Sequence, residues 1–278
     1  MKQLCVIGDP IAHSKSPLIQ NAMIKALGLD YEYTAVRVSA GETALFLERA
    51  RAGEFSGFNA TMPHKQNLIP LMDELDADAR AFGAVNTVAI REGRAYGYNT
   101  DGAGFLAALA DSGIDPAGQS VMVLGAGGAA RVVAPKLRQE GAKTVFVCNR
   151  TPERAMALCR SDVRMTPAGF DPKTLGEIAA RCSLVVNCTS LGMTGTGADF
   201  PDLFFLEELP SGAAVVDAIY APPETSLLRR ARELGYPTMN GLGMLVNQAV
   251  LALERFVGEP IDGKRAKAAA LAALGAGR

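Results

Sequence analysis

The chain has 278 residues, of which 49% are hydrophobic and 21% are charged, and its formal net charge is −1. The length suits one large domain or two of ordinary size, and the apolar content is that of a globular chain rather than a disordered one. The near-neutral charge excludes the basic footprint of a nucleic-acid-binding protein and of a protein attracted to an anionic membrane.

Membrane proteins, secreted proteins and metalloproteins are also disfavoured. No apolar run approaches the roughly 18 residues that a bilayer-spanning helix needs, and the first residues lack the pattern of a signal peptide. The chain has five cysteines without a CxxC pair, and its only histidines are His13 and His64. We therefore expect buried, reduced thiols in a cytoplasmic protein, no metal site, and neither nucleic acid nor a membrane as partner.

Strand and helix patterns alternate along the chain, which is typical of an α/β protein with mostly parallel strands. In the first half we expect strands at 4–8, 31–38 and 57–62, and a pair of strands within 83–99 that turns near Glu92 and Gly93. We expect helices in this half at 16–29, 41–52, 66–75 and 102–113.

A second unit begins near Ser120. Strands are expected at 120–128, 144–150, 183–189 and 213–219, with helices between them and two final helices at 241–258 and 263–275. Pro135 falls inside the helix expected after the glycines, where it should remove a backbone hydrogen bond and bend the helix. The pattern predicts two α/β domains, residues 1–101 completed by the C-terminal helices at about 241–278, and residues 102–240, with a cleft between them.

A glycine-rich turn follows the strand that starts at Ser120. It reads Gly125-x-Gly127-x-x-Ala130, directly after a strand and at the start of a helix. Gly125 permits the tight turn, Gly127 lets the backbone approach a pyrophosphate, and Ala130 allows close packing of helix on strand. The free N–H groups at the helix N-terminus favour phosphate. This context indicates a dinucleotide-binding loop in a Rossmann-type domain; a plain tight turn is the alternative.

The next strand ends in "NRTPER" (149–154), without an acidic residue at its tip. An NAD-specific site normally places Asp or Glu there to bind the ribose 2′-hydroxyl. Arg150 and Arg154 instead suit a 2′-phosphate, although Glu153 lies between them. The pattern favours NADP over NAD, and a solvent-exposed helix face is the alternative role for Arg154.

Four short polar clusters stand at predicted strand ends in the first half: residues 13–16, 59–65, 85–87 and 98–102. Ligands of open α/β sheets bind beyond the carboxyl ends of the strands. Hydroxyl and amide groups there suit a polyhydroxylated ligand, and Lys65 and Asp101 add one charge of each sign. Taken singly, these residues could instead be turn formers or caps; Ser14 or Ser16, beside Pro17, fits a helix N-cap.

Together these stretches resemble the shikimate dehydrogenase family over nearly the whole chain. The matching segments are "VIGDPIAHSKSP", "GFNATMPHK", "GAVNTV", "GYNTDG", "VLGAGGAAR", "NRTPERA", "VNCTSLGM" and "NGLGMLVNQA", in the family's order. The resemblance implies NADP-dependent reduction of 3-dehydroshikimate to shikimate, on the route to aromatic compounds. It also implies that the first domain binds substrate and that the second, a Rossmann-type domain, binds the cofactor.

The resemblance also implies roles for single residues. Lys65 and Asp101 match the catalytic pair. The implied substrate contacts are Ser14, Ser16, Asn59, Thr61, Asn86, Tyr220 and Gln248. The implied cofactor contacts are Gly125, Ala126, Gly127, Gly128, Ala129, Asn149, Arg150, Thr151 and Arg154, with Ala218, Gly241 and Met244 near the nicotinamide end. Both serines of "SKS" are present, which favours shikimate as substrate.

Carbonyl reduction needs a hydride donor and a proton donor near the carbonyl oxygen. NADPH would supply the hydride and Lys65 the proton, with Asp101 orienting the ammonium group; His64 is a rival base. Two other functions stay open: a quinate/shikimate dehydrogenase that uses NAD, and a non-catalytic sensor of a shikimate-like metabolite. The protein is expected to be a monomer or a homodimer.

Overall fold

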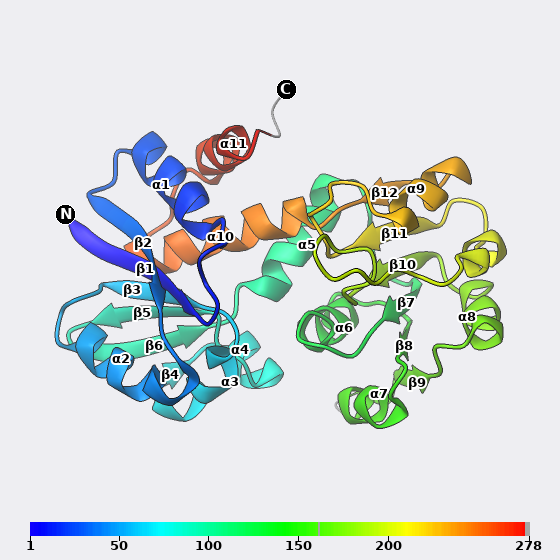
Figure 1. Ribbon diagram of the computed structural model, residues 1–278, viewed down its shortest axis with the longest axis horizontal. Helices are drawn as coiled ribbons and strands as arrows, with labels where there is room; N and C mark the ends of the chain where they lie inside the picture. The colour runs from blue at the N-terminus through cyan, green and yellow to red at the C-terminus, as the bar shows by residue number, and fades with distance from the viewer. Residues whose placement is uncertain (161, 276–278) are drawn as a thin grey trace. The chain divides into compact units, whose positions relative to one another are not determined.

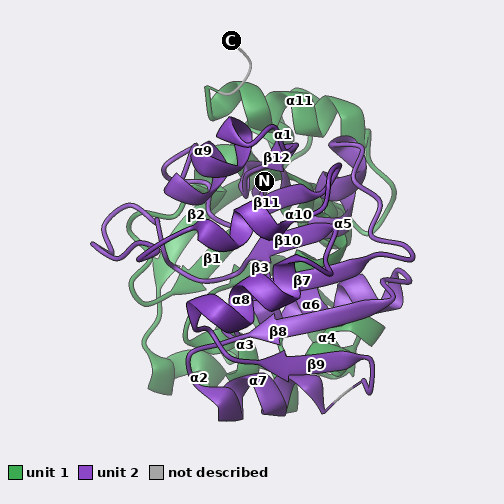
Figure 2. Cartoon of the chain, turned by 90° about the vertical axis from the view of Figure 1, so that its right-hand side faces the viewer, with its two compact units in different colours: residues 1–104, 246–278 green, residues 105–245 purple. Residues whose placement is uncertain are grey.

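The structure is a computed structural model that describes residues 1–160 and 162–275. It divides into two compact units. Unit 1 comprises Met1–Gly104 and the C-terminal segment from Val246, and unit 2 comprises Phe105–Leu245 (Figures 1 and 2). Each contains one sheet of six strands with helices packed against it. None of the helices in the described part of the chain is long and apolar enough to cross a membrane.

Unit 1 is built on a mixed sheet with the strand order β2-β1-β3-β5-β6-β4. Its elements in chain order are β1 (Lys2–Gly8), α1 (Ser16–Leu27), β2 (Tyr31–Arg37), η1 (Ala40–Glu42), α2 (Thr43–Arg51), β3 (Gly57–Ala60), α3 (His64–Asn67), η2 (Ile69–Leu71), β4 (Glu74–Leu75), α4 (Ala77–Phe82), β5 (Thr87–Arg91), β6 (Arg94–Tyr98) and α11 (Gly263–Ala273). Two further helices, α5 (Asp101–Asp111) and α10 (Leu242–Val257), each begin in one unit and end in the other.

The apolar run of β1 explains its central place in this sheet. Leu4, Cys5, Val6 and Ile7 are all buried, as expected for a strand covered on both faces. β1 pairs in parallel with β2 and with β3, whereas β5 runs antiparallel to β3 and to β6. The C-terminal helix α11 packs against α1.

Unit 2 is a fully parallel sheet with the order β12-β11-β10-β7-β8-β9. Its elements are β7 (Ser120–Leu124), α6 (Ala130–Gln139), β8 (Thr144–Cys148), α7 (Pro152–Cys159), β9 (Met165–Ala168), α8 (Pro172–Ala179), β10 (Leu184–Asn187), η3 (Phe204–Glu208), β11 (Ala214–Asp217), α9 (Ser226–Glu233) and β12 (Thr238–Met239). If β7 is counted as strand 1, the order is 3-2-1-4-5-6, the doubly wound order of dinucleotide-binding folds. The strands added after β9 are placed on the other side of β7, so the strand order reverses between β7 and β10.

Alternate residues of β7 contribute to the two cores of unit 2. Val121 and Val123 pack with helices α5, α6 and α7 on one face. Met122 and Leu124 pack with α8, η3 and α9 on the other. This period of two along a strand that is apolar at every position marks a strand buried on both faces. The expected α/β fold with two sheets is confirmed.

The expected helix at 66–75 is wrong. The chain makes one α-helical turn and a 3₁₀ turn, and then β4 pairs with β6. The backbone N–H of Asp73 donates to Ala95 at 2.9 Å, and the N–H of Asp76 donates to Gly97 at 2.9 Å. Pro70 has no N–H to donate to a continued helix, so pairing with the sheet overrides the helical pattern.

Other boundaries differ less. β3 ends at Ala60 rather than Met62, because the N–H of His64 turns back to the carbonyl of Thr61. The short elements α4, β9 and β12 were not predicted, since two to six residues carry little periodicity. α6 continues through Pro135, which has no N–H to donate to the carbonyl of Arg131. Arg131 is exposed, so water can bond to that carbonyl instead.

Gly104 sets the packing of α5 on α10 within unit 1. A Cβ at this position would lie 2.6 Å from the backbone nitrogen of Gln248. We therefore predict that Gly104→Ala lowers the free energy of unfolding by about 1–3 kcal/mol, because two helix backbones must move apart. Denaturant unfolding of this variant and of Gly41→Ala, whose added Cβ meets nothing within 4 Å, measures the effect. Equal stability of the two variants would contradict it.

Candidate active site

One edge of the sheet in unit 1 collects the polar clusters. β5 is antiparallel, so its first residue, Thr87, lies opposite Asn59 at the end of β3 and opposite Tyr98 at the end of β6. The carboxyl ends of β3 and β6 and the amino end of β5 therefore meet at one side of the sheet. The segments that follow β3 and β6, and the segment that leads into β5, all lie there. These segments carry Lys65, Asp101 and Asn86.

The loop after β1 reaches the same edge. The N–H of Thr61 donates to Ile7 and the N–H of Asp9 donates to Met62, both at 3.0 Å. A Cβ at Gly8 would lie 2.5 Å from the methyl carbon of Thr61, so glycine allows the two loops to cross closely. This crossing fixes the loop that leads to Ser14 and Ser16.

The two serines stand at the start of α1 and are half-buried. Ser16 is the first residue of α1, and the residue before it, Lys15, makes no side-chain cap. The hydroxyl oxygen of Ser14 accepts the N–H of Ser16 at 3.2 Å, so Ser14 takes part of the capping role. The Ser16 hydroxyl and the remaining valences of Ser14 stay able to bind a ligand.

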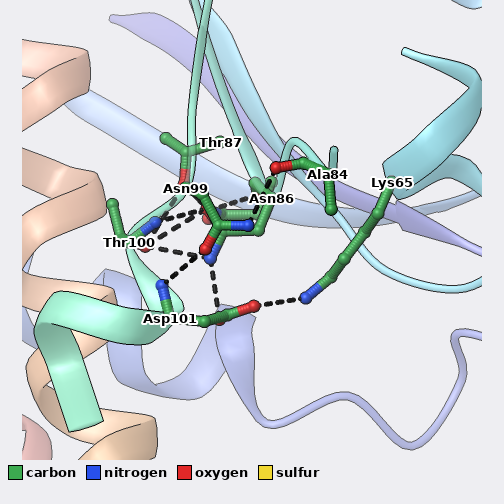
Figure 3. A network of polar contacts seen from close by, with 8 residues as sticks. Lys65, Ala84, Asn86, Thr87, Asn99, Thr100 and Asp101 are labelled. Atoms are coloured by element: carbon green, nitrogen blue, oxygen red, sulfur yellow. Dashed lines mark hydrogen bonds and ion pairs between the residues drawn. The ribbon is translucent and has the colours of Figure 1, made fainter. Parts of the chain in front are cut away.

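Lys65 and Asp101 form an ion pair at the start of α3 and α5 (Figure 3). Lys65 Nζ donates to Asp101 Oδ2 at 2.6 Å, and the two side chains are 32% and 16% exposed. Asp101 Oδ1 accepts from Asn86 Nδ2 at 2.8 Å. The backbone N–H of Asp101 donates to Asn99 Oδ1 at 3.1 Å. The carboxylate is thus held from both oxygens, and the ammonium group keeps two donors for a ligand.

The amides of Asn59 and Asn86 are both buried and both bonded within unit 1. Asn59 Nδ2 donates to the Asn86 carbonyl at 3.1 Å and to Thr87 Oγ1 at 2.9 Å. Asn86 Nδ2 donates to Asp101 and to Thr100 Oγ1, the latter at 3.0 Å. Their hydrogens are fully committed, so a ligand can accept from either amide only by sharing or displacing one of these bonds.

His64 adjoins Lys65 in sequence but its ring is fully buried. The two ring nitrogens lie 2.8 Å from Thr43 Oγ1 and 2.8 Å from the carbonyl oxygen of Val38. Both are therefore occupied, one by Val38 directly after β2 and the other by Thr43 at the start of α2. This packing fastens α3 to the rest of unit 1 and removes the imidazole from the ligand-facing groups, which disfavours His64 as the base.

The glycine turn of unit 2 has the conformation that the sequence predicted. Gly125 has φ +99°, a left-handed conformation that glycine adopts without strain. A Cβ added to Gly127 or Gly128 would meet nothing within 4 Å, so the backbone there is open to a ligand. Ala130 is fully buried at the start of α6. Gly127 and Gly128 are exposed directly before α6, an arrangement that suits an anion.

Asn149 joins this turn to the tip of β8. Its Oδ1 accepts the N–H of Ala126 at 3.2 Å, and its Nδ2 donates to the carbonyl of Thr151 at 2.8 Å. Arg150, Thr151 and Arg154 follow and are all exposed. Asn149 therefore orders the two segments relative to each other, and the two guanidinium groups remain available to an anion.

A cavity of about 430 Å³ lies in unit 2 at the carboxyl ends of β10 and β11. Its walls are Ala129, residues 188–190, Met193, Thr194 and residues 218–221. The predicted cofactor contact Ala218 and the predicted substrate contact Tyr220 both line it. Gly241 lies against Ala218, since a Cβ there would be 2.1 Å from the Ala218 carbonyl oxygen. Met244, half-buried, packs against the core that includes residues of α5, α6 and α7.

A buried carboxylate, that of Asp217, connects the loops that line this cavity. Asp217, with no exposed surface, accepts from Asn187 Nδ2 at 3.0 Å, from the N–H of Ile219 at 2.9 Å, and from Thr225 Oγ1 at 2.7 Å. Asn187 Oδ1 in turn accepts from the hydroxyl of Thr189 at 2.7 Å. The network ties the loop after β10 to the loop after β11. Burial raises the pKa of Asp217 from 3.8 to about 6, although its three hydrogen bonds oppose the shift.

The predicted residues thus form three groups. Lys65, Asp101 and the other first-half residues lie with Gln248 in unit 1, the glycine turn and residues 149–154 meet in unit 2, and Tyr220 lines the cavity of unit 2. Asn99 and Thr100 lie in the polar cluster that was predicted at 98–102, whereas sequence reasoning missed Tyr33, Asn187 and Asp217. Polar residues at the ends of apolar strands, as in "VVNCT" and "VVDAI", were the available signal for the last two.

The parallel sheet with its glycine turn after the first strand defines a two-unit α/β protein with a Rossmann-type fold. Residues 6–88 match the family described as "Shikimate dehydrogenase substrate binding domain", and residues 108–192 match "Shikimate / quinate 5-dehydrogenase". The NADP(+)-dependent shikimate dehydrogenase of Citrifermentans bemidjiense is 43% identical over 275 residues, which cover 95% of this chain and 93% of that protein. The chain belongs to the shikimate dehydrogenase family.

Solved structures agree with this assignment. Shikimate 5-dehydrogenase of Thermus thermophilus, in complex with NADP(H) and shikimate, is 37% identical and has a TM-score of 0.86, covering 99% of this chain and 100% of that chain. The 5-ketofructose reductase of a Gluconobacter strain is 33% identical with a TM-score of 0.85, covering 97% of each chain. Similar folds therefore accompany more than one substrate.

Asp217 should make the stability of the protein depend on pH in a specific window. Its pKa is raised in the folded state, so its contribution to stability is present below its unfolded pKa of 3.8 and is lost as pH rises through about 6. Asp217→Asn removes this ionisation and can keep the geometry, because Nδ2 can donate to Thr225. The free energy of unfolding of the variant, relative to the parent, should therefore rise by about 2 kcal/mol between about pH 4 and pH 7.

Paired denaturant unfolding curves at several pH values measure this difference. Asp115→Asn, at an exposed carboxylate that accepts the N–H of Ala117, is the matched control and should show a much smaller change. A difference between Asp217→Asn and the parent that stays constant across this range would contradict the prediction.

Proposed function

We propose that the protein catalyses the reversible NADPH-dependent reduction of 3-dehydroshikimate to shikimate. The observation that carries the proposal is the ion pair of Lys65 and Asp101, 2.6 Å apart at the polar edge of unit 1, in a chain that belongs to this family. An ammonium group beside a carboxylate, among hydroxyl and amide groups, suits a substrate with several hydroxyls and a carbonyl that gains a proton. Five buried, free cysteines suit a cytoplasmic location.

The residues of unit 2 fit NADP. The open backbone of Gly127 and Gly128, beside the positive φ of Gly125, forms a cradle that a side chain would fill. Arg150 and Arg154 can bind a 2′-phosphate, and the cavity beside Ala218 suits the nicotinamide ring. When bound, the reduced cofactor supplies the hydride. Gly241 keeps the wall of the cavity at Ala218 in place.

Lys65 transfers the proton in this proposal. In the direction of reduction its ammonium group donates to the carbonyl oxygen of the substrate, and in the reverse direction the neutral amine accepts the hydroxyl proton. Asp101 holds the amine in one orientation, and Asn86 and Asn99 hold Asp101. The pair is half-buried, so a bound substrate need displace little water to reach it.

Substrate orientation falls to the remaining groups of unit 1. We assign the carboxylate of the substrate to the hydroxyls of Ser14 and Ser16, and its ring hydroxyls to Thr61 and Gln248. Asn59 and Asn86 contribute through the bonds that they already make. Tyr220, which lines the cavity of unit 2 and is 39% exposed, is the one predicted substrate contact outside unit 1.

A second candidate is the oxidation of quinate, because the family that matches residues 108–192 includes quinate in its description. The two functions separate in one steady-state experiment, which follows the absorbance of the reduced nicotinamide with shikimate or quinate and with NADP⁺ or NAD⁺. Shikimate with NADP⁺ should give the highest kcat/KM. Comparable values for quinate would move the protein to the quinate/shikimate group, and binding of shikimate without turnover would make it a sensor.

Arg150 should set the preference for NADP over NAD. Replacing it with glutamine removes a charge-assisted contact to the 2′-phosphate, so the Kd for NADP⁺ should rise by about 10- to 150-fold. The Kd for NAD⁺, which lacks that phosphate, should change little. Fluorescence titration measures both, with Arg229→Gln, at an exposed arginine of α9, as the control. Equal losses for the two cofactors would contradict the assignment.

Lys65→Ala should reduce kcat by about 10²–10⁴-fold, the range for one general acid–base residue. The KM for shikimate should change much less, since the lost interaction acts mainly in the transition state. Asp101→Ala should also be severe, and the double variant should cost less than the product of the two single losses. His64→Ala, at the buried ring, should keep most of kcat. A rise in KM with unchanged kcat would mean that Lys65 only anchors the substrate.

A further inference from the structure

A buried tyrosine lies at the far end of the polar network that holds Asp101. Tyr33, on β2, is 1% exposed, and its hydroxyl donates to Asn59 Oδ1 at 2.6 Å. Burial raises the pKa of the Tyr33 phenol well above 10, so the hydroxyl keeps its proton and remains a donor. Nothing in the proposed reaction uses this residue, and β2 is separated from β3 by β1 in the sheet.

The bond to Asn59 is the first in a continuous series. Asn59 Nδ2 donates to Thr87 Oγ1 at 2.9 Å, and the Thr87 hydroxyl donates to Asn86 Oδ1 at 2.8 Å. Asn86 Nδ2 then donates to Asp101 Oδ1 at 2.8 Å, which Figure 3 shows beside the ion pair. Asn59, Thr87 and Asn86 are at most 9% exposed, so bulk water does not compete for these bonds.

The direction of this series is fixed by backbone groups at two points. Asn59 Nδ2 also faces the carbonyl oxygen of Asn86, which can only accept, so this atom of the amide must be the nitrogen. The atom that faces the Tyr33 hydroxyl is therefore the amide oxygen. Asn86 Oδ1 also faces the N–H of Thr100, at 2.9 Å, which can only donate. The hydroxyl of Thr87 must therefore accept from Asn59 and donate to Asn86, and every donor points towards Asp101.

We propose that Tyr33 is a positioning residue for the Lys65–Asp101 pair, acting through the directed series Tyr33–Asn59–Thr87–Asn86. The proposal rests on the function proposed above. Hydrogen bonds aligned head to tail in a buried site polarise one another, so a donor at one end strengthens the bond at the other. The terminal acceptor is the Asp101 carboxylate, whose second oxygen holds the ammonium group of Lys65. Tyr33 thereby restricts the orientation of the proton-transferring amine from a strand that bears none of the predicted site residues.

Tyr33→Phe tests the proposal, because it removes the first donor and keeps the ring. The expected result is a fall in kcat of roughly five- to tenfold, the effect of one buried hydrogen bond, with the KM for shikimate and the Kd for NADP⁺ within about twofold of the parent. Tyr236→Phe is the matched control. Its hydroxyl donates to the carbonyl of Leu209 at 2.9 Å in unit 2, outside the series, and its loss should leave kcat unchanged.

A second variant separates the series from a general loss of stability. Thr87→Val interrupts the series in the middle and retains the shape of the side chain, and it should lower kcat to a similar extent. Because an interrupted series cannot be interrupted again, Tyr33→Phe/Thr87→Val should have the same kcat as Thr87→Val alone. Independent structural effects would multiply instead. Should Tyr33→Phe fail to fold, Thr87→Val and Asn59→Ser, which also interrupts the series, take its place in this comparison.

The side-chain amide signals of Asn86 give a readout without turnover. In the ligand-free protein, Tyr33→Phe should shift these NMR signals, and Tyr236→Phe should not. Unchanged kcat in Tyr33→Phe, a rise in KM alone, losses that multiply in the double variant, or unmoved Asn86 signals would each overturn the proposal. If the parent enzyme does not oxidise shikimate, the proposed function fails, and the NMR comparison still decides whether Tyr33 acts on Asn86.

Discussion

The ion pair of Lys65 and Asp101 imposes the main constraint on unit 1. Two charges that are mostly withdrawn from water are stable only if their remaining hydrogen-bonding groups find partners. Asn86 bonds to the second carboxylate oxygen, Asn99 accepts the backbone N–H of Asp101, and Thr100 holds Asn86. These residues come together only because β5 runs antiparallel and begins where β3 and β6 end. The mixed sheet thus brings these polar groups together at one side. A fully parallel sheet would need longer connections for the same result, because parallel strands are joined by crossovers rather than hairpins.

Both units place an asparagine beside an aspartate at the carboxyl end of buried strands, with different consequences. Asp101 has a cation as its partner and lies partly exposed, where a ligand can reach the pair. Asp217 has only neutral donors and is fully buried, so its pKa rises and it acts as a structural anchor between two loops. The same pair of residue types serves a reactive group in unit 1 and the shape of a cavity in unit 2.

The sequence determined much of this structure because many of its signals are local. Apolar runs such as "LCVIG" and "SVMVL" specify buried strands, and the glycines at 125–128 specify a turn that few other residues could adopt. Asn149 and Arg150 lie next to that turn in space because they directly follow the neighbouring parallel strand β8, and Arg154 follows in α7. The family resemblance rests on these same local stretches, and the comparisons confirm it.

Tertiary structure alone decided which polar residues meet. Residues 66–75 have helical spacing, yet hydrogen bonds from Asp73 and Asp76 to β6 draw the segment into the sheet. His64 and Lys65 are neighbours in sequence, but the backbone turns one side chain into the core and leaves the other at the sheet edge. Tyr33 on β2 reaches Asn59 on β3 because both strands pair with β1. These contacts depend on strand order and register, which are set by packing over distances that local periodicity does not encode.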